Sequence, residues 1–551
     1  MLLILRTIAF LVCLLPVTAL SAEPSRAESS WDQQASRQLR KALNINPFLL
    51  LELDRPVLNN FYRERAYRPV WTSEKGRLQR ADELIDAIAN AADEGLKPDE
   101  YYLAEIKKYL NASNVEQAVN LEMWLSAALF RYAHDRYAGR LESFNVDPDW
   151  HIQNSVLDMS ALFSRIADNG SIRGLLDDLS PPQDGYHELR DALRRYRDIA
   201  GEGGWGRIWV LLKPGMRHEK VRDLRRRLVQ EGDLQGHVQD DLAADDSDDD
   251  TKIELSKSDF FDDNLQQAVK RYQRRHGLLP TGTTDDRTLR SLNVSVEDRI
   301  EQILINMERW RWLPRNLGRR YLAVNMTGFE LAIINDGHVE LSMPVIIGKK
   351  FQETPALSGV ISYFEYNPYW TISKNVMWEK FIPGQIQDPD YLERRSVRVY
   401  RGWANAQEVD PKTIDWTSLD PEHNSPYWMR QDPGPGNALG NLKFIFSNPY
   451  QIYLHGTPDT HLFNHSARAF SHGCIRVKDP ASLAASLLGD TSEQGIDRVK
   501  ARLDSGLNEK VHLPFAMPVY LMYWTAWVDA DGVLNFRDDI YGRDTRLREL
   551  L

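Results

Sequence analysis

A cysteine and two histidines lie close together late in the chain, in a pattern that suits nucleophilic catalysis. His455 follows a short apolar segment, and Ser471-His472-Gly473-Cys474 comes after fifteen further residues. A thiol becomes a nucleophile when a base takes its proton, and acyl transfer also needs donors for the developing oxyanion. Because Gly473 permits a tight turn, the amides of Gly473 and Cys474 are candidate donors. The pattern predicts Cys474 as a nucleophile.

Two histidines compete for the role of base. His472 is two residues from Cys474, and in an extended segment both side chains would share one face. His455 has to be brought to the thiol by the fold, so spacing alone leaves both histidines open. A helix beginning after Cys474 would favour the thiolate further, because a helix N-terminus carries partial positive charge.

The N-terminus predicts an export signal over residues 1–22. Arg6 precedes an apolar stretch over residues 8–17, and small residues follow it. This stretch is too short to span a bilayer, so cleavage is expected, with an uncleaved membrane anchor as the alternative. Cys13 would leave with the signal. Cys474 would then be the one cysteine of the mature chain, unable to form an intramolecular disulfide.

Strand patterns surround the Cys-His segment and predict a β-rich catalytic domain over residues 320–528. Asn335-Asp336-Gly337 joins two alternating segments, 329–334 and 338–347, as a tight hairpin turn does. Further strands are expected at 443–446, 452–454 and 519–527. Residues 383–440 interrupt the pattern with prolines and aromatics, which indicates a lid-like insertion. A linker helix over 295–314 is expected before the domain, and a C-terminal tail over 529–551 after it.

The part of the chain before the β-rich domain has the apolar spacing of helices. Apolar residues at three- and four-residue spacing predict a helical scaffold domain over 31–210 and a small three-helix domain over 211–294. The second domain holds an acidic insert, 233–257, which we expect to form a mobile loop. The predicted fold class is therefore multidomain α+β, with a helical N-terminal scaffold, a small three-helix domain and a β-rich catalytic domain with a lid.

Composition excludes several classes of protein. The 551 residues predict several domains, and 42% hydrophobic residues with 15 tryptophans provide ample material for packed cores. This excludes a wholly disordered chain and a polytopic membrane protein. The formal net charge of −11 disfavours a non-specific nucleic-acid binder, and no nucleic-acid partner is expected.

The spacing of His455 and Ser471-His472-Gly473-Cys474 resembles the signature of the L,D-transpeptidase (YkuD-type) catalytic domain. The resemblance implies that Cys474 is the nucleophile, that His455 accepts and donates the proton, and that the Gly456 carbonyl orients the imidazole. His472, with Ser471 and Gly473, would then support the loop or contact substrate. Arg476 stands where many members carry asparagine, and it could steady the loop or meet a substrate carboxylate.

A wider resemblance, to the large Gram-negative YcbB-like subgroup, covers most of the chain. The run 268–278, with Thr281-Gly282 after it, is similar to peptidoglycan-binding domains of the three-helix type. Tyr453 and Trp370 stand where this subgroup places substrate-facing aromatics.

The resemblance also implies a reaction and a location. Cys474 would attack a diamino acid in a peptidoglycan stem peptide, release D-alanine and pass the acyl group to a second stem, with no cofactor. Carbapenems would acylate the same thiol. Donor and acceptor stems are the expected partners, together with glycan-polymerising cell-wall enzymes. The expected location is the periplasm, in association with the inner membrane or the cell wall, and membrane contact would come only through an uncleaved signal segment.

The same residues are also compatible with other functions. Water or a protein could replace the acceptor stem, giving an L,D-carboxypeptidase or an enzyme that attaches or detaches wall proteins. Alternatively, the chain could be a non-catalytic wall-binding scaffold. His461 and His465 have a zinc-site spacing, but no glutamate follows His461 as the metalloprotease motif requires, so no metal is expected. Papain-like peptidases place cysteine before histidine, the reverse of the order here.

Overall fold

The computed structural model describes residues 29–45, 55–235, 259–420 and 425–551. The predicted signal, Cys13 and nearly all of the acidic insert lie outside these ranges. The chain divides into two compact units, which are described separately below. Among the described residues, no helix is both long and apolar enough to serve as a membrane span.

The first unit is helical, and its described residues are 29–45, 55–85, 102–128 and 159–172. Its helices are α1 (Ser30–Ile45), α2 (Arg55–Glu64), α4 (Leu103–Lys108) and α7 (Met159–Asp168), with most of α3 (Gln79–Ala89) and the first part of α5 (Val115–Ala138). A small hairpin joins β1 (Thr72–Ser73) to β2 (Gly76–Arg77). The buried Glu122 carboxylate accepts hydrogen bonds from the Trp71 and Thr72 amides and from the Tyr62 hydroxyl. These bonds satisfy a carboxylate that burial would otherwise penalise.

The second unit begins with short helices and contains the three-helix domain. After two short 3-10 helices, Ala91–Glu94 and Pro98–Tyr101, and the last part of α5, its elements are α6 (Ser143–Val146), β3 (Trp150–His151), α8 (Arg173–Asp177) and α9 (Asp184–Gly201). The three-helix domain consists of α10 (Lys220–Gln230), α12 (Asp263–Arg275) and α13 (Asp286–Leu292) around its own apolar core. Asp262 and Asp285 cap the last two helices by accepting from backbone amides. Asp233, at the start of the predicted mobile insert, is instead buried and pairs with Arg275 at 2.6 Å.

The predicted linker helix is α14 (Val296–Arg311), and its residues belong to the core of the second unit. Ile303, Met307 and Trp310 lie within the same apolar cluster as the strands that follow. The helix therefore helps to build the catalytic domain as well as leading into it.

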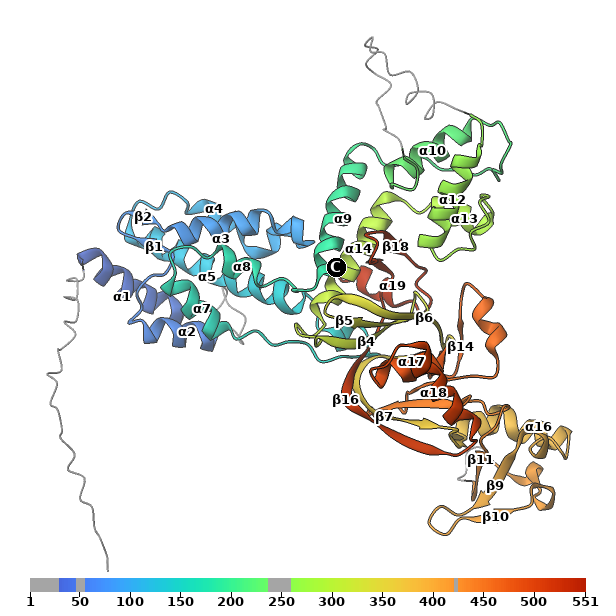
Figure 1. Ribbon diagram of the computed structural model, residues 1–551. Coiled ribbons are helices and arrows are strands. Elements are labelled where there is room, and N and C mark those ends of the chain that lie inside the picture. Colours follow the sequence, from blue (N-terminus) through green and yellow to red (C-terminus); the bar gives the residue numbers. More distant parts are fainter. Residues whose placement is uncertain (1–28, 46–54, 236–258, 421–424) are drawn as a thin grey trace, which may run out of the picture. The chain divides into compact units, whose positions relative to one another are not determined.

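The catalytic domain is a sheet that closes on itself. Its strands are β4 (Arg320–Asn325), β5 (Glu330–Asn335), β6 (His338–Gly348), β7 (Ala356–Tyr366), β12 (Leu442–Phe446), β13 (Leu454–His455), β14 (Ala469–Ser471), β15 (Ile475–Val477) and β16 (Glu509–Met522). The order β12-β13-β15-β6-β5-β4-β16-β7-β3 closes because β12 also pairs with β7, while β14 pairs with β6. The helices α17 (Pro480–Leu487) and α18 (Glu493–Asp504) follow β15, and Leu483 and Leu487 of α17 enter the core. Figure 1 shows β4, β5 and β6 side by side, as the predicted hairpin requires.

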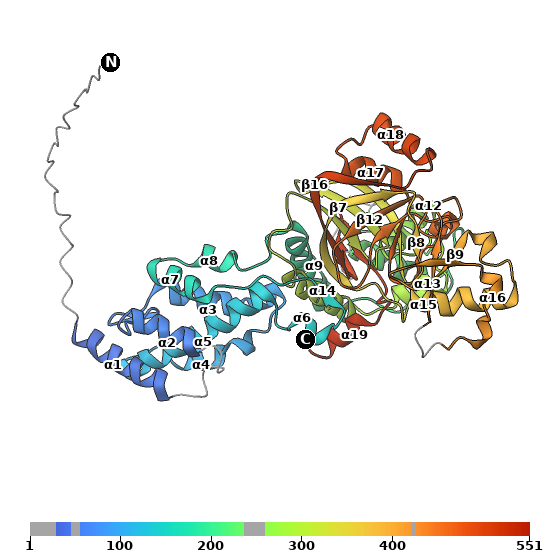
Figure 2. The same ribbon diagram turned by 90° about the horizontal axis from the view of Figure 1, so that it is seen from below.

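The insertion forms a subdomain with its own sheet and core, called the lid below. The sheet order is β10 (Gln407–Val409), β9 (Val397–Arg401), β11 (Tyr427–Gln431) and β8 (Trp370–Thr371). The helices α15 (Lys374–Val376) and α16 (Ile382–Gln387) flank the π-helix Met377–Phe381. The lid starts near residue 370, ahead of the predicted boundary at 383, because β8 pairs with β11 and Ile372, Met377 and Phe381 supply its core. Figure 2 shows β8, β9 and α16 gathered beside the barrel strands.

The C-terminal segment is also packed into the second unit. β17 (Ala526–Val528) pairs with β18 (Leu534–Phe536), and α19 (Arg543–Arg548) follows. Phe536, Tyr541 and Leu547 are buried in the main core. The predicted tail, 529–551, is therefore part of the catalytic domain's support. In class the fold is multidomain α+β, as predicted.

Candidate active site

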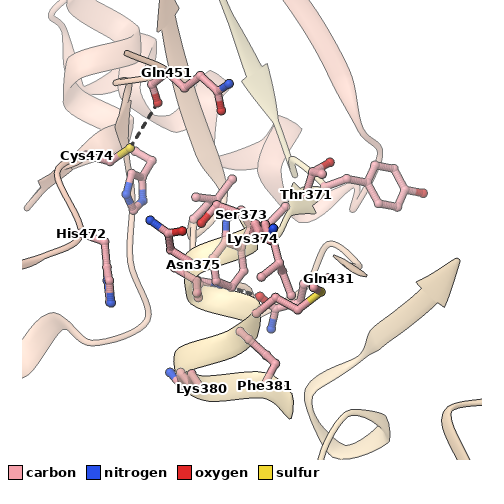
Figure 3. Close-up of a pocket in the computed structure, with 18 of the residues that line it drawn as sticks. Thr371, Ser373, Lys374, Asn375, Lys380, Phe381, Gln431, Gln451, His472 and Cys474 are labelled. Carbon is pink, nitrogen blue, oxygen red and sulfur yellow. Dashed lines mark hydrogen bonds between the residues drawn. The ribbon is translucent and has the colours of Figure 1, made fainter. Parts of the chain in front are cut away.

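One large cavity of about 1300 Å³ lies between the barrel and the lid, and it contains the residues singled out for chemistry. Cys474, His455, His472, Ser471, Arg476, Tyr453 and Trp370 all line it. Figure 3 shows Cys474 on the barrel side, with Ser373, Lys374 and Asn375 of the lid across the cavity from it. The cavity is larger than the usual 300–1,000 Å³ of a small-ligand pocket, so there is room for a sizeable substrate.

Cys474 stands just before β15 and is partly exposed. Its Sγ contacts the Gln451 carbonyl oxygen at 3.7 Å, drawn as a dashed line in Figure 3. Burial raises the pKa of the Cys474 thiol, while the amide and hydroxyl of Tyr453 and the charge of Lys443 act to lower it. The resting group is therefore a neutral thiol at neutral pH, and it would need a base to act as a nucleophile.

His455 ends β13 and is buried. Its Nδ1 lies 2.5 Å from the Gly456 carbonyl oxygen. A carbonyl can only accept, so Nδ1 carries the hydrogen and Nε2 keeps a lone pair. Burial and the nearby Arg476 guanidinium lower the pKa of His455 to about 3. The imidazole is therefore neutral and oriented as a base.

Strand pairing places His455 and Cys474 on the same face of the sheet, and a turn directs His472 away from Cys474. β13 and β15 are parallel, with His455 beside Arg476, and Cys474 is two residues before Arg476. Side chains two residues apart share a face of an extended segment, so Cys474 lies on the His455 side. Gly473 has φ +110°, which breaks the extended path that would have put His472 beside Cys474. Figure 3 shows His472 directed away from Cys474.

The loop before Cys474 is held by its own hydrogen bonds. The Gly473 amide donates to Ser471 Oγ at 3.1 Å, and that hydroxyl donates to the Cys474 carbonyl at 2.5 Å. The Gly473 amide, expected to face the oxyanion, is thus engaged within the loop. No acceptor takes the Cys474 amide in the described part of the chain, which leaves it as the loop's remaining donor. A strand follows Cys474 instead of a helix, so no helix dipole assists the thiolate.

Residues far from the motif support this loop from beneath, and we call them the buttress: Gly348, Thr354 and Tyr541. Thr354 Oγ1 donates to the Gly473 carbonyl at 2.7 Å and accepts from the Gly348 amide at 2.9 Å. The Tyr541 hydroxyl donates to the Gly348 carbonyl at 2.6 Å. The C-terminal segment therefore contributes to the position of the nucleophile. Nothing in the sequence pattern around Thr354 or Tyr541 indicates this role.

Two cationic side chains, Arg476 and Lys443, lie close to His455 and Cys474 in the cavity. Arg476 forms an ion pair with Asp459 at 3.2 Å and lines the cavity. Lys443 is aligned with His455 across β12 and β13, and its Nζ lies 4.2 Å from the centre of the Tyr453 ring. Burial lowers the pKa of both cations. The sequence analysis missed Lys443. Lys443 could have been found from its position between the buried Leu442 and Phe444, because alternation along a strand places it on the opposite face.

The two expected aromatics join this group. Both rings line the cavity with Cys474, and burial, followed by the Cys474 side chain, raises the pKa of Tyr453. Trp370 belongs to β8 of the lid and Tyr453 to the barrel segment before His455. Tyr453 and Trp370 therefore line the cavity from the barrel and from the lid, respectively.

The lining of the cavity is positively charged, although the chain is acidic overall. Among its described lining residues, lysines and arginines outnumber the single acid, Asp459, which is itself paired with Arg476. The cations are Lys374, Lys380, Arg395, Lys443 and Arg476. A pocket of this kind favours an anionic ligand. No group of three histidine, cysteine, aspartate or glutamate side chains that could hold a metal occurs in the described ranges.

Three parts of the chain match known family models. Residues 319–500 match the family model "L,D-transpeptidase catalytic domain", residues 217–292 match "Putative peptidoglycan binding domain", and residues 56–193 match "Scaffold domain". A Haemophilus influenzae protein described as "Putative L,D-transpeptidase" is 33% identical over 256 residues, which are 46% of this chain and 50% of that protein. The chain thus matches about half the length of this curated relative.

Solved structures were also compared. An L,D-transpeptidase from Mycobacterium smegmatis is 13% identical with a TM-score of 0.18, over 37% of this chain and 58% of that one. An L,D-transpeptidase from Stackebrandtia nassauensis is 13% identical with a TM-score of 0.21, over 56% of this chain and 94% of that one. From the family matches, the chain carries a catalytic domain of the YkuD L,D-transpeptidase family, joined to a domain of the peptidoglycan-binding family.

Proposed function

We propose that this protein is a cysteine L,D-transpeptidase that forms direct cross-links between the diamino acids of two peptidoglycan stem peptides. The observation that carries the proposal is that Cys474 and a neutral, oriented His455 line one large cationic cavity. Stem peptides carry several carboxylates, and the cations beside Cys474 and on the lid suit such a ligand.

In the first half of the reaction, His455 Nε2 takes the Cys474 proton as Sγ attacks the carbonyl of the donor's diamino acid. The Cys474 amide donates to the resulting oxyanion in this proposal. Collapse of the tetrahedral intermediate breaks the amide bond to terminal D-alanine, whose nitrogen receives the proton from His455. A thioester on Cys474 and free D-alanine are the products.

In the second half, the side-chain amine of an acceptor stem attacks the thioester and gives a proton to His455. The C–S bond breaks, a new amide forms, and the thiolate recovers its proton from the imidazole. The lid helps by excluding water, which would otherwise hydrolyse the thioester. The periplasm is the proposed location, since that compartment gives access to the wall.

Product analysis tests the proposal. Protein lacking residues 1–22 is incubated with disaccharide-tetrapeptide, and the products are resolved by liquid chromatography and mass spectrometry beside a Cys474→Ala control. A dimer with the mass of two monomers less one D-alanine, absent from the control, is expected. Tripeptide monomer as the only product would reassign the enzyme to carboxypeptidase chemistry. An absence of any Cys474-dependent product would contradict catalysis.

A further inference from the structure

Three aromatic side chains of the lid form a stack that neither the lid core nor the catalytic pair uses. Trp428 lies between the two others: its ring centre is 4.5 Å from that of Tyr400, at 18°, and 5.1 Å from that of Trp403, at 11°. We call Tyr400, Trp428 and Trp403 the aromatic stack. Near-parallel rings at these separations attract one another, so the three hold a common orientation.

The stack lies on the face of the lid sheet opposite to its core. Val399 of β9 and Met429 of β11 point into the lid core. Tyr400 and Trp428 are their neighbours along the strands and are paired with each other across β9 and β11, so they occupy the other face. This face contributes to the cavity, because Trp403 and Trp428 both line it with Cys474 and His455.

Exposure increases along the stack. Tyr400 is 9% exposed, whereas Trp403 at the outer end is 71% exposed. Single exposed aromatics are common on protein surfaces, but Trp403 is stacked on Trp428 and both line the cavity, so the two indoles form a continuous apolar patch of the kind that marks a binding surface. Its continuity with the catalytic cavity indicates that this surface binds the substrate.

The stack is preorganised. The Trp428 indole N–H donates to the Gly402 carbonyl at 2.8 Å, which fixes the turn that leads into Trp403. Gly402 has φ +75°, a conformation that favours glycine. At the inner end, the Arg430 guanidinium donates to the Tyr400 hydroxyl at 2.8 Å and lies 5.1 Å from the centre of its ring. A surface ordered in advance loses little entropy when it binds.

We propose that Trp403 and Trp428 form a platform for the pyranose rings of the glycan that carries the stem peptide. This inference rests on the proposed function, since it assigns the sugar part of that substrate. β-Linked pyranoses with equatorial substituents present a flat, uncharged face of C–H groups, which packs on an indole. The cations beside Cys474 would take the stem, and the uncharged stack would take the sugar.

A substrate comparison tests the platform. The ratio of kcat/KM for disaccharide-tetrapeptide to kcat/KM for sugar-free tetrapeptide is measured in the wild type and in Trp403→Ala. Loss of one stacking surface should lower this ratio about ten-fold, mainly through KM of the sugar-bearing substrate. Trp403→Phe should recover most of it. Phe515→Ala removes an exposed aromatic of β16 that does not line the cavity, and it should leave the ratio unchanged. An unchanged ratio in Trp403→Ala would overturn the platform.

A binding experiment separates failure of this inference from failure of the proposed function. Peptide-free glycan strands are added to the Cys474→Ala protein, and hydrogen exchange is followed by mass spectrometry. Protection should appear in residues 400–403 and 427–429, and Trp403→Ala should abolish it even if the enzyme proves inactive. No protection there would overturn the platform. Protection that instead depends on protein concentration without glycan would assign the stack to self-association and overturn it too.

Discussion

The barrel and the lid place their functional groups in different ways. On the barrel, the nucleophile loop is fixed by buried bonds from Thr354 and Ser471 within a sheet that closes on itself. The lid has an open four-stranded sheet, and surface ion pairs such as Arg398–Asp432 contribute to it. Buried satisfied bonds hold geometry more firmly than exposed ion pairs do. We infer that the barrel sets the chemistry and the lid selects and encloses the substrate.

Among the substitutions that test this difference between barrel and lid, the largest loss of activity should come from replacing His455. His455→Ala removes the base, and kcat should fall by roughly 10²–10⁴-fold, the usual contribution of a general base. The lid is not involved, so substrate KM should change little. Steady-state kinetics check this, with His472→Ala as the matched histidine control. If His472→Ala caused the larger loss, the assignment of the base would be wrong.

The pH dependence of Cys474 alkylation tests whether the thiol and His455 are both neutral on the barrel side of the cavity. Burial raises the pKa of Cys474, and the pKa of His455 is about 3, so both groups are neutral between pH 5 and pH 8. Alkylation of Cys474 by iodoacetamide should therefore rise about ten-fold per pH unit from pH 6 to pH 8. A rate that is already constant above pH 5 would indicate a thiolate–imidazolium pair and contradict this electrostatic description.

The next largest effect, on stability and on kcat, should come from substitutions in the buttress. Thr354→Val keeps the shape but leaves the Gly473 carbonyl and the Gly348 amide without their partner, at about 1–3 kcal/mol of stability for each. The loop should also lose precision, and kcat should fall roughly ten- to one hundred-fold. Thr354→Ser retains the hydroxyl and should restore kcat. Thermal unfolding and kinetics measure the two effects, and a Thr354→Val protein with normal kcat would remove the buttress from the account.

A smaller effect is expected from a cavity in the lid core. Leu392 is fully buried there, and Leu392→Ala should cost about 2–5 kcal/mol of local stability. Water should then reach the thioester more often, raising the tripeptide share of the products severalfold. Hydrogen exchange should increase in residues 370–440 while β4, β5 and β6 remain protected. Equal loosening of the barrel would show that the two regions are not independent.

The smallest effect is expected from the contact between His472 of the barrel and Glu379 of the lid, which is an ion pair only when His472 is protonated, and burial lowers the pKa of His472. His472 Nε2 lies 3.8 Å from the Glu379 carboxylate, and both side chains are about half exposed. Such pairs contribute about 0–1 kcal/mol, so Glu379→Gln should change kcat/KM less than five-fold. A much larger loss would mean that His472 holds the lid closed over the cavity.

The sequence predicted the parts of the site that depend on local pattern. Asn335-Asp336-Gly337 specifies its own turn, with positive φ at Asp336 and Gly337, and the hairpin was confirmed. Cys474 and His455 could be singled out because few residue types perform this chemistry. Spacing alone left both His455 and His472 open as the base, because it does not contain the turn at Gly473 that directs His472 away from Cys474.

Long-range contacts could not be predicted in this way. Thr354 and Tyr541 act through single hydrogen bonds between segments 119 and 193 residues apart, and neither has a distinctive neighbourhood in the sequence. The lid boundary was placed too late because Trp370-Thr371 is a two-residue strand, recognisable only from its pairing with β11. The packed C-terminal segment was missed for the same reason, because its burial depends on the barrel.

The proposed mechanism requires that a stem peptide becomes covalently attached to Cys474. Protein mixed with disaccharide-tetrapeptide and quenched in acid within milliseconds to seconds can be analysed by intact-mass and peptide mass spectrometry. The account predicts an adduct with the mass of the substrate less D-alanine, on the peptide that contains Cys474 and absent in Cys474→Ala. Turnover without such an adduct, or an adduct on another residue, would contradict it.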